Sequence, residues 1–118
     1  MLDLGQLSVY LSASPCDMRK GINGLSIDVQ CVLESNPLSG HVFVFYNRAR
    51  NKIKCLYYDR NGFAMWYKVL ERGKFTIPKV TDASPTLQLE IRELQWLLAG
   101  LDIEKLQPHR SLNYGAIY

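Results

Sequence analysis

Residues 41–77, HVFVFYNRARNKIKCLYYDRNGFAMWYKVLERGKFTI, decide the fold of this chain. Four runs within this stretch are rich in β-branched and aromatic residues, and polar or glycine-containing segments separate them; the runs are 42–46, 53–58, 63–70 and 75–77. Such runs are typical of β-strands that are joined by tight turns. Asn61-Gly62, between the second and third runs, is a strong hairpin signal because these residues tolerate a positive φ. The stretch therefore predicts an antiparallel β-meander with three hairpins.

The first predicted turn of the meander concentrates positive charge. Residues 47–52 and the start of the next strand place four cations at one hairpin tip: Arg48, Arg50, Lys52 and Lys54. The bias extends beyond the turn, because residues 1–80 carry 11 Lys and Arg against 6 Asp and Glu, whereas residues 81–118 carry 3 against 5. A basic sheet region favours an anionic partner. The alternative is that lysines on strands only discourage aggregation between sheet edges and bind no ligand.

Elements on both sides of the meander are expected to complete an α+β fold. The alternating pattern of residues 7–12 predicts a first strand that joins the sheet most simply at an edge. A long N-terminal helix is predicted to begin at Ser14 or Asp17, which are both good N-cap residues, and to run to Leu33. A shorter C-terminal helix is predicted over 88–99, with residues 79–86 as the loop before it. The predicted fold is thus an antiparallel β-meander of about four to five strands packed by these two helices.

Length and composition indicate one globular domain. With 118 residues, of which 47% are hydrophobic and 21% are charged, the chain is long enough to bury a core without disulfide or metal support. Hydrophobic periodicity becomes weak after Asp102, and no repeat or low-complexity tract occurs. We therefore predict a single domain over 1–102 and a C-terminal tail over 103–118 that is mobile or is taken up by a neighbouring chain.

Several functional classes lack their signatures in this sequence. Three cysteines without a Cys-x-x-Cys pair, and two histidines, supply too few ligands for a zinc site, so no metal or cofactor is expected. No glycine-rich phosphate loop or nucleophile elbow occurs, and we expect a protein that is not an enzyme. The best enzymatic alternative is a magnesium site formed by Asp17, Asp59 and Glu71, although capping and turn formation are simpler roles for these residues. Without a signal peptide or an apolar run of about 18 residues, a cytoplasmic protein with no membrane contact is expected.

Aromatic side chains are dense in the meander, and strand alternation sends them to both faces of the sheet. A single helix stripe covers only one face, so some aromatic surface is left over. Exposed rings beside cations would suit stacking on nucleic-acid bases, whereas rings under the second helix or a dimer mate would simply be core. The candidates for contact with a partner are Trp66, Trp96 and Tyr58.

The chain resembles one protein family over residues 8–102. The motifs are DMRKGINGL at 17–25, NPLSGHVFVF at 36–45, NR at 47–48, KIK at 52–54, YD at 58–59, Gly62, LERGKF at 70–75, LL at 97–98 and GLD at 100–102. This combination is similar to the TnpB accessory protein, which the second open reading frame of insertion sequences of family sixty-six encodes. The chain departs from that pattern at Ile22, Asn23 and Ile103, where an aromatic residue, an acidic residue and a tryptophan would be expected. The resemblance implies a non-catalytic protein that transposition needs beside a separate transposase.

Charge and resemblance together predict an accessory protein of bacterial transposition that binds DNA, at the ends of the element, through the basic hairpin tip. The predicted DNA-binding residues are the four tip cations and four helpers: Arg48, Arg50, Lys52, Lys54, Arg19, Lys20, Arg72 and Lys74. Arg19 and Lys20 belong here because the dipole of the predicted N-terminal helix would disfavour cations in its first turn unless an anion lay nearby. The alternative is an adaptor that binds the transposase, or a second copy in a homodimer, through Trp66, Trp96 and Tyr58 without contacting DNA.

Overall fold

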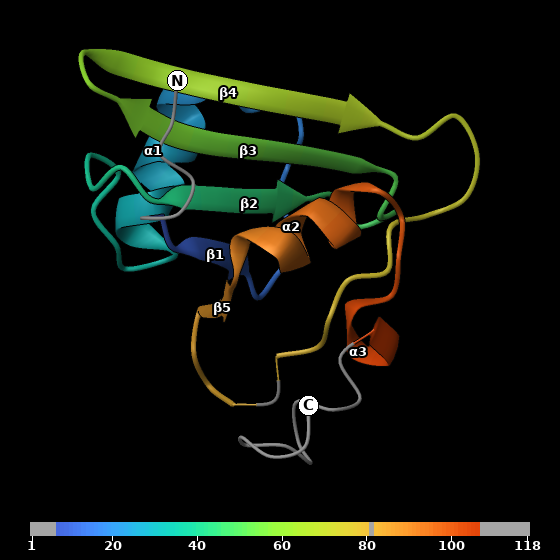
Figure 1. Cartoon of the computed structure of the whole chain (residues 1–118). Coiled ribbons are helices and arrows are strands. Elements are labelled where there is room, and N and C mark those ends of the chain that lie inside the picture. The colour runs from blue at the N-terminus through green and yellow to red at the C-terminus, as the bar shows by residue number, and fades with distance from the viewer. Residues whose placement is uncertain (1–6, 81, 107–118) are drawn as a thin grey trace, which may run out of the picture.

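The computed structural model describes residues 7–80 and 82–106, in which one sheet lies between two helical layers (Figure 1). The strands are β1 (Val9–Ser12), β2 (Val42–Tyr46), β3 (Lys52–Asp59), β4 (Gly62–Val69) and β5 (Thr86–Leu89), and the helices are α1 (Ile22–Cys31), α2 (Ile91–Leu98) and α3 (Ile103–Leu106). The strand order in the sheet is β4-β3-β2-β1-β5. The predicted α+β class is confirmed, and the differences concern where the elements begin and which strands pair.

Two of the three predicted hairpins are confirmed, because β2, β3 and β4 are antiparallel neighbours. The second hairpin closes on the pair Asp59 and Gly62, so its two turn residues are Arg60 and Asn61. Arg60, with φ 57°, is the residue that takes the left-handed conformation. The predicted third hairpin is wrong, since residues 70–80 form no strand. The N–H of Phe75 instead donates to the carbonyl of Arg50 at 2.7 Å, which carries the chain across the end of the sheet.

The prediction that the first strand lies at an edge of the sheet is wrong. β1 is parallel to β2, with Val9 opposite Val42, and is antiparallel to β5, with Val9 opposite Leu89. A parallel pair needs a long crossover connection, and the segment that contains α1 supplies it. β5 then takes the edge position that we had expected for the first strand. Residues 86–89 therefore form a strand, where the loop and the start of the second helix were predicted.

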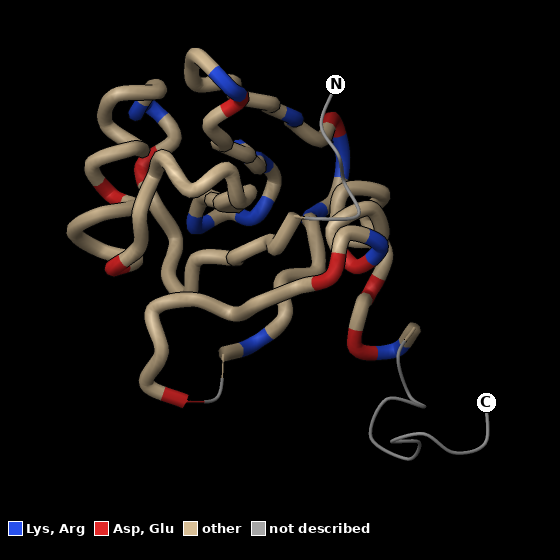
Figure 2. Tube along the Cα trace, turned by 60° about the vertical axis from the view of Figure 1, so that its left-hand side comes forward, with Lys and Arg blue, Asp and Glu red and all other residues tan. Residues whose placement is uncertain are grey.

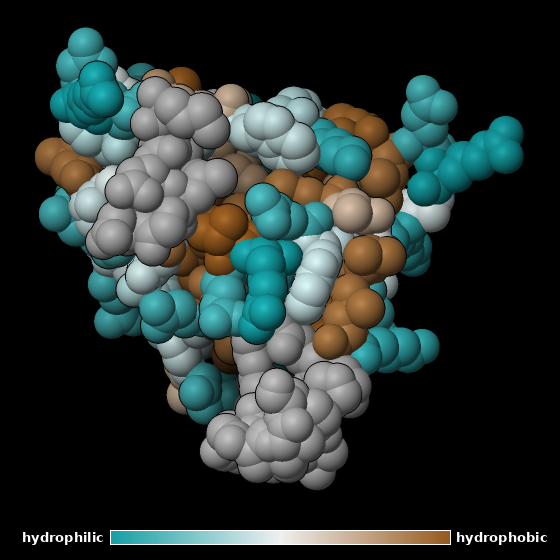
Figure 3. Space-filling model, in the orientation of Figure 1, coloured by the Kyte–Doolittle hydropathy of each residue, from teal (hydrophilic) through white to brown (hydrophobic). Residues whose placement is uncertain are grey.

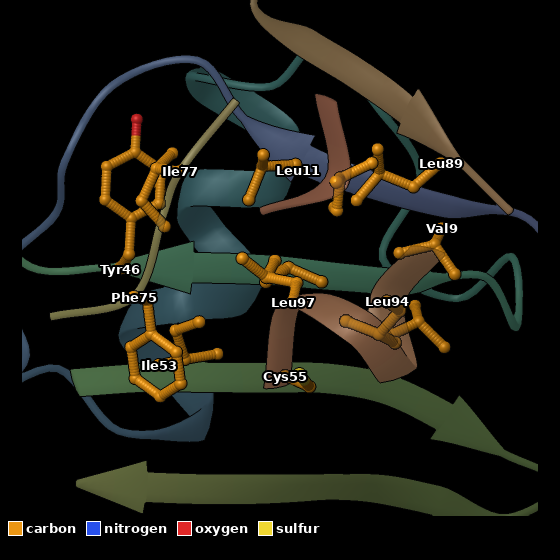
Figure 4. Close-up of a cluster of buried hydrophobic side chains, with 13 residues drawn as sticks. Val9, Leu11, Tyr46, Ile53, Cys55, Phe75, Ile77, Leu89, Leu94 and Leu97 are labelled. Carbon is orange, nitrogen blue, oxygen red and sulfur yellow. The ribbon is translucent and has the colours of Figure 1, made fainter. Parts of the chain in front are cut away.

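Both faces of the sheet are buried at its centre, as the burial of all five β2 residues indicates. The face toward α1 packs a cluster composed of Leu25, Val29, Leu33, Phe43, Phe45 and Leu56. The opposite face carries the larger cluster of Figure 4, where Leu94 and Leu97 of α2 meet side chains of β1, β2 and β3. Phe75 and Ile77 complete this second cluster from the loop after β4. The core therefore depends on residues outside the regular elements.

The N-terminal helix is shorter than predicted, because α1 begins at Ile22 and not near Ser14 or Asp17. Hydrogen bonds to the sheet hold the preceding segment in a non-helical path. The N–H of Cys16 donates to the carbonyl of Tyr46 at 2.8 Å. The ammonium group of Lys54 donates to the carbonyls of Met18 and Lys20. These carbonyls are the groups that a longer helix would need for its own hydrogen bonds. The predicted placement of Arg19 and Lys20 in a first helical turn is therefore wrong.

The second helix ends near Gly100 as predicted, but α2 begins at Ile91. Its start is fixed by a capping box, in which the N–H of Glu90 donates to the carboxylate of Glu93 at 2.8 Å. α3 follows within the segment that we expected to be a tail, and its Ile103 is buried in the larger cluster. The prediction for the rest of the tail falls on residues 107–118, which lie outside the described part of the chain.

Replacing Phe75 by alanine is expected to lower the free energy of unfolding by about 3–5 kcal/mol, because its side chain is buried in the larger cluster. Thr76 is exposed one position later, and Thr76→Ala should change the free energy of unfolding by no more than about 0.5 kcal/mol. Urea denaturation followed by tryptophan fluorescence measures both values. Equal stability of the two variants would contradict the packing of Phe75 in the core.

Candidate nucleic-acid interface

The turn between β2 and β3 is held together by the hydrogen bonds of one asparagine. The side-chain oxygen of Asn47 accepts the N–H groups of Asn51 and Lys52, both at 3.0 Å, and its amide donates to the side chain of Asn51 at 2.7 Å. Its backbone carbonyl accepts the N–H of Arg50 at 2.9 Å. Because the side chain of Asn47 accepts the backbone N–H groups of the turn, Arg48 and Arg50 are not needed for these bonds. The side chains of Arg48 and Arg50 are exposed.

A second basic loop lies beside this turn. The N–H of Leu70 donates to the carbonyl of Asn51 at 2.9 Å, and the N–H of Phe75 donates to the carbonyl of Arg50 at 2.7 Å. The residues between these two bonds, 71–74, are all exposed and include Arg72 and Lys74. Four exposed cations thus share this end of the sheet, which we call the basic end: Arg48, Arg50, Arg72 and Lys74. The structure brings the helpers Arg72 and Lys74 next to the predicted tip.

The cations of the basic end are not neutralised within residues 7–80 and 82–106, where the ion pairs involve Arg19, Lys20 and Arg92. Glu71 lies in the same exposed loop, so the basic end is not purely cationic. In Figure 2, segments of Lys and Arg are interspersed with segments of Asp and Glu along the trace. An anion would therefore be held at local sites and not across a broad basic surface.

The prediction that Lys54 belongs to the exposed tip is wrong, because its side chain is only 6% exposed. Lys54 lies opposite Phe45 and points toward the α1 face of the sheet. Its ammonium group donates to the carbonyls of Met18 at 2.7 Å and Lys20 at 2.8 Å, and it lies 4.8 Å from the centre of the Tyr67 ring. Two carbonyls and a ring face satisfy this buried charge, so Lys54 has a structural role. Lys52, two residues earlier on the same face, is half-buried.

Arg19 and Lys20 are each paired with a carboxylate, which weakens the prediction that they assist at the tip. The guanidinium group of Arg19 binds Asp17 at 2.8 Å, and the ammonium group of Lys20 binds Asp28 at 2.8 Å. The hydrogen bonds from Arg19 lower the pKa of Asp17 to about 2. The bond to Asp28 raises the pKa of Lys20. Both cations therefore already have an anionic partner.

The predicted magnesium alternative is not assembled by the fold. Asp59 ends β3 at the turn that begins β4, whereas Glu71 follows the other end of β4. An eight-residue strand separates them by roughly 25 Å. Asp17 is engaged with Arg19. Within the described residues, no three His, Cys, Asp or Glu side chains form a group that could hold a metal ion.

The predicted partner-binding aromatics have different environments. Trp66 is 43% exposed on β4, and its neighbours Tyr67 and Val69, which we did not single out, are exposed to a similar degree. Trp96 is half-buried against the larger cluster, with the guanidinium of Arg92 at 5.6 Å from its ring. Tyr58 is also half-buried and packs edge-on against Phe63. The leftover aromatic surface is therefore concentrated on β4.

The face that carries α2 and α3 is of mixed polarity. Figure 3 shows brown hydrophobic areas there, interrupted by hydrophilic side chains. Leu101 and Leu106 are the large apolar residues with high exposure in the segment after α2. None of the helices in the described part of the chain has the length and apolar character that crossing a membrane requires.

A known protein family matches nearly the whole length of the chain. Residues 7–108 match the family described as IS66 Orf2-like protein, TnpB_IS66. The chain belongs to this family. As an IS66 Orf2-like protein, it is an accessory protein associated with transposition, which agrees with the resemblance seen in its motifs.

Two relatives of this IS66 Orf2-like protein come from Sinorhizobium fredii (strain NBRC 101917 / NGR234). Uncharacterized protein y4jC is 36% identical over 96 residues, which cover 81% of this chain and 80% of the relative. Uncharacterized protein y4hO is 35% identical over 103 residues, which cover 86% and 88%. No solved structure matches the chain.

Replacing Lys54 by methionine is expected to lower the free energy of unfolding by about 2–4 kcal/mol, because two charge-assisted hydrogen bonds are lost. Lys52→Met is the matched control, since Lys52 lies on the same face of β3 and its side chain makes no hydrogen bond or ion pair within the described residues. The control should stay within about 0.5 kcal/mol of the parent protein in urea denaturation. A harmless Lys54→Met would show that the ammonium group does not anchor the segment before α1.

The Asp17 carboxyl group should titrate in the folded protein with a pKa of about 2, below its ordinary 3.8, when followed by NMR. Because the folded-state pKa is lowered, any stability that this pair contributes is complete above about pH 4 and is lost as the pH falls toward 2. Arg19→Ala should raise the pKa toward 3.8, since the side-chain hydrogen bonds from Arg19 are the largest cause of the shift. Arg92→Ala should leave it unchanged, because Arg92 pairs with Glu90.

Proposed function

We propose that this IS66 Orf2-like protein is a non-catalytic accessory factor that contacts DNA phosphates through its basic end during transposition. The observation that carries the proposal is the backbone hydrogen bond between Phe75 and Arg50, which joins the loop after β4 to the turn between β2 and β3. This bond places two pairs of exposed cations at one end of the sheet. Family membership supports transposition as the process in which the protein acts.

Phosphate contact requires only reach and positive charge, and both are properties of the basic end. None of its four cations has an ion-pair partner in the described chain, although Arg72 and Lys74 share their loop with Glu71. Arginine can bind a phosphate through two parallel hydrogen bonds, which suits Arg48, Arg50 and Arg72. None of these four residues lies on a helix of the described chain, so we propose backbone contact and not reading of base edges.

Binding of this kind is expected to be moderate in strength and sensitive to salt. Each phosphate contact lowers the slope of log K against log salt concentration by about 0.9, so four contacts bind strongly only at low ionic strength. We propose that the transposase of the same element supplies sequence specificity, and that the two proteins act together on element ends in the cytoplasm. In the alternative function, an adaptor without DNA contact, exposed Trp66 on β4 would be the contact residue. Whether the purified protein alone retards DNA separates the two functions.

Replacing Arg48, Arg50, Arg72 and Lys74 together by alanine is expected to weaken binding to a short labelled DNA duplex and to flatten its salt dependence. The slope should become less negative by up to about 0.9 for each phosphate contact that is lost. Fluorescence anisotropy over a series of salt concentrations measures both effects. Circular dichroism should show an unchanged fold, because all four side chains are exposed.

A second quadruple variant with the same change in net charge serves as the control. It replaces exposed cations outside the basic end: Arg60, Lys79, Arg92 and Lys105. If DNA binding depends on the basic end, this control keeps most of the affinity and most of the salt slope. An equal loss in both variants would mean that total charge, and not this arrangement of loops, attracts the DNA.

A further inference from the structure

Within the described part of the chain, no strand pairs with the outer edge of β4. β4 is eight residues long and is the terminal strand of the described sheet, bordering only β3 (Figure 1). Natural edge strands are usually guarded by charge, proline, bulges or short length. The β5 edge follows this rule, since it has four residues and is preceded by Pro85. β4 contains no proline, and its one charged residue, Lys68, donates to the carbonyl of Leu98 at 2.9 Å and is thereby drawn over α2.

The register of the β3–β4 ladder identifies the backbone groups that point outward. The pair Asp59 and Gly62 closes the hairpin, and Leu70 donates to Asn51 at the other end of the ladder. In an antiparallel ladder, alternate residues direct both backbone groups toward the partner strand or away from it. The even-numbered residues of β4 therefore bond to β3. The N–H and C=O groups that point outward belong to Phe63, Met65, Tyr67 and Val69.

We propose that β4 is the interface through which a second copy of this chain docks, by antiparallel β4–β4 pairing about a twofold axis at Trp66. An isologous contact of this kind needs only one self-complementary strand. Outward groups can pair only with outward groups, so odd-numbered residues must lie opposite odd-numbered residues. Centring the pair on residue 66 is the register that pairs all four outward residues of β4. Centring it on residue 65 leaves Val69 unpaired, and centring it on residue 67 leaves Phe63 unpaired.

The side chains of β4 are compatible with that register. Phe63 would lie opposite Val69 of the second copy, and Met65 would lie opposite Tyr67 of the second copy. On the other face, Trp66 would meet its own equivalent, and the single cation Lys68 would lie opposite Ala64. No like charges face each other, and aromatic and β-branched pairs across strands are favourable. The pairing would cover the exposed side chains of β4, which are Trp66, Tyr67 and Val69.

A cysteine at the twofold axis tests both the interface and its register. The parent for this test carries Cys31→Ser, because Cys31 is exposed, and Cys55→Ala, because Cys55 lies directly opposite residue 66 on β3 and would compete for a new cysteine there. Cys16 is kept, since burial raises the pKa of its thiol to about 11. Directly opposed residues of a non-hydrogen-bonded pair have Cα atoms about 4.5 Å apart, within the range that a disulfide spans. Trp66→Cys should therefore form a disulfide-linked dimer under mild oxidation. Ala64→Cys should not, because two copies of residue 64 would be about 14 Å apart along the strands.

Light scattering coupled to size exclusion tests the dimer without a cysteine. The unmodified protein should show twice the monomer mass of 13.5 kDa. Met65→Pro should return the mass to that of a monomer, since the lost N–H points away from β3 and proline is tolerated at an outward position of an edge strand. A monomeric parent protein, equal cross-linking at residues 64 and 66, or a dimer that survives Met65→Pro would each overturn the proposal. DNA binding by the basic end is measured separately and does not enter these outcomes.

Discussion

The buried ammonium group of Lys54 is the interaction on which the arrangement of the N-terminal half depends. It joins the centre of β3 to the carbonyls of Met18 and Lys20, which lie 36 and 34 residues earlier in the chain. A charge without water is tolerated only when hydrogen bonds or ring faces surround it, and here the ring of Tyr67 completes its surroundings. Because these carbonyls are engaged by a side chain, the segment stays non-helical and α1 begins only at Ile22.

Two ion pairs lie on or beside the segment that Lys54 binds. Lys20 and Asp28 form an ion pair beside the segment that Lys54 holds, and Arg19 folds back onto Asp17. Three basic residues that could have faced an anionic partner are thereby used within the protein. The cations that remain exposed without a partner in the described chain are carried mainly by loops at the end of the sheet, where turn hydrogen bonds fix the backbone and leave the side chains extended. Charge needed for the fold and charge available to a ligand are thus separated in space.

The two proposed surfaces lie on different parts of the same hairpin system. The basic end follows the C-terminal end of β4, whereas the outer edge of that strand is the surface proposed for a second copy. Antiparallel pairing of two β4 strands would direct the two basic ends away from each other, to opposite ends of the central strand pair. A dimer of this form would present two basic ends, either to one DNA molecule or to two.

The sequence by itself determined the features that depend on neighbouring residues. Alternation of aromatic and β-branched residues predicted β2, β3 and β4, polar turns predicted their hairpins, and the motifs predicted the family. The polar turn also placed Arg48 and Arg50 on an exposed tip. These features are local because turn geometry and the strand period of two are set over a few residues.

Only the tertiary structure decided which of the cations face solvent and which strands become edges. Lys52 and Lys54 alternate along the strand as exposed lysines would. Nothing near them in the sequence indicates that Lys54 donates to the carbonyls of residues 18 and 20. Likewise, β1 became an inner strand because residues 86–89 pair with its far side, and Arg72 joined Arg50 because Phe75 is buried across the end of the sheet. Each outcome depends on contacts between residues far apart in the chain, and local patterns carry no record of such contacts.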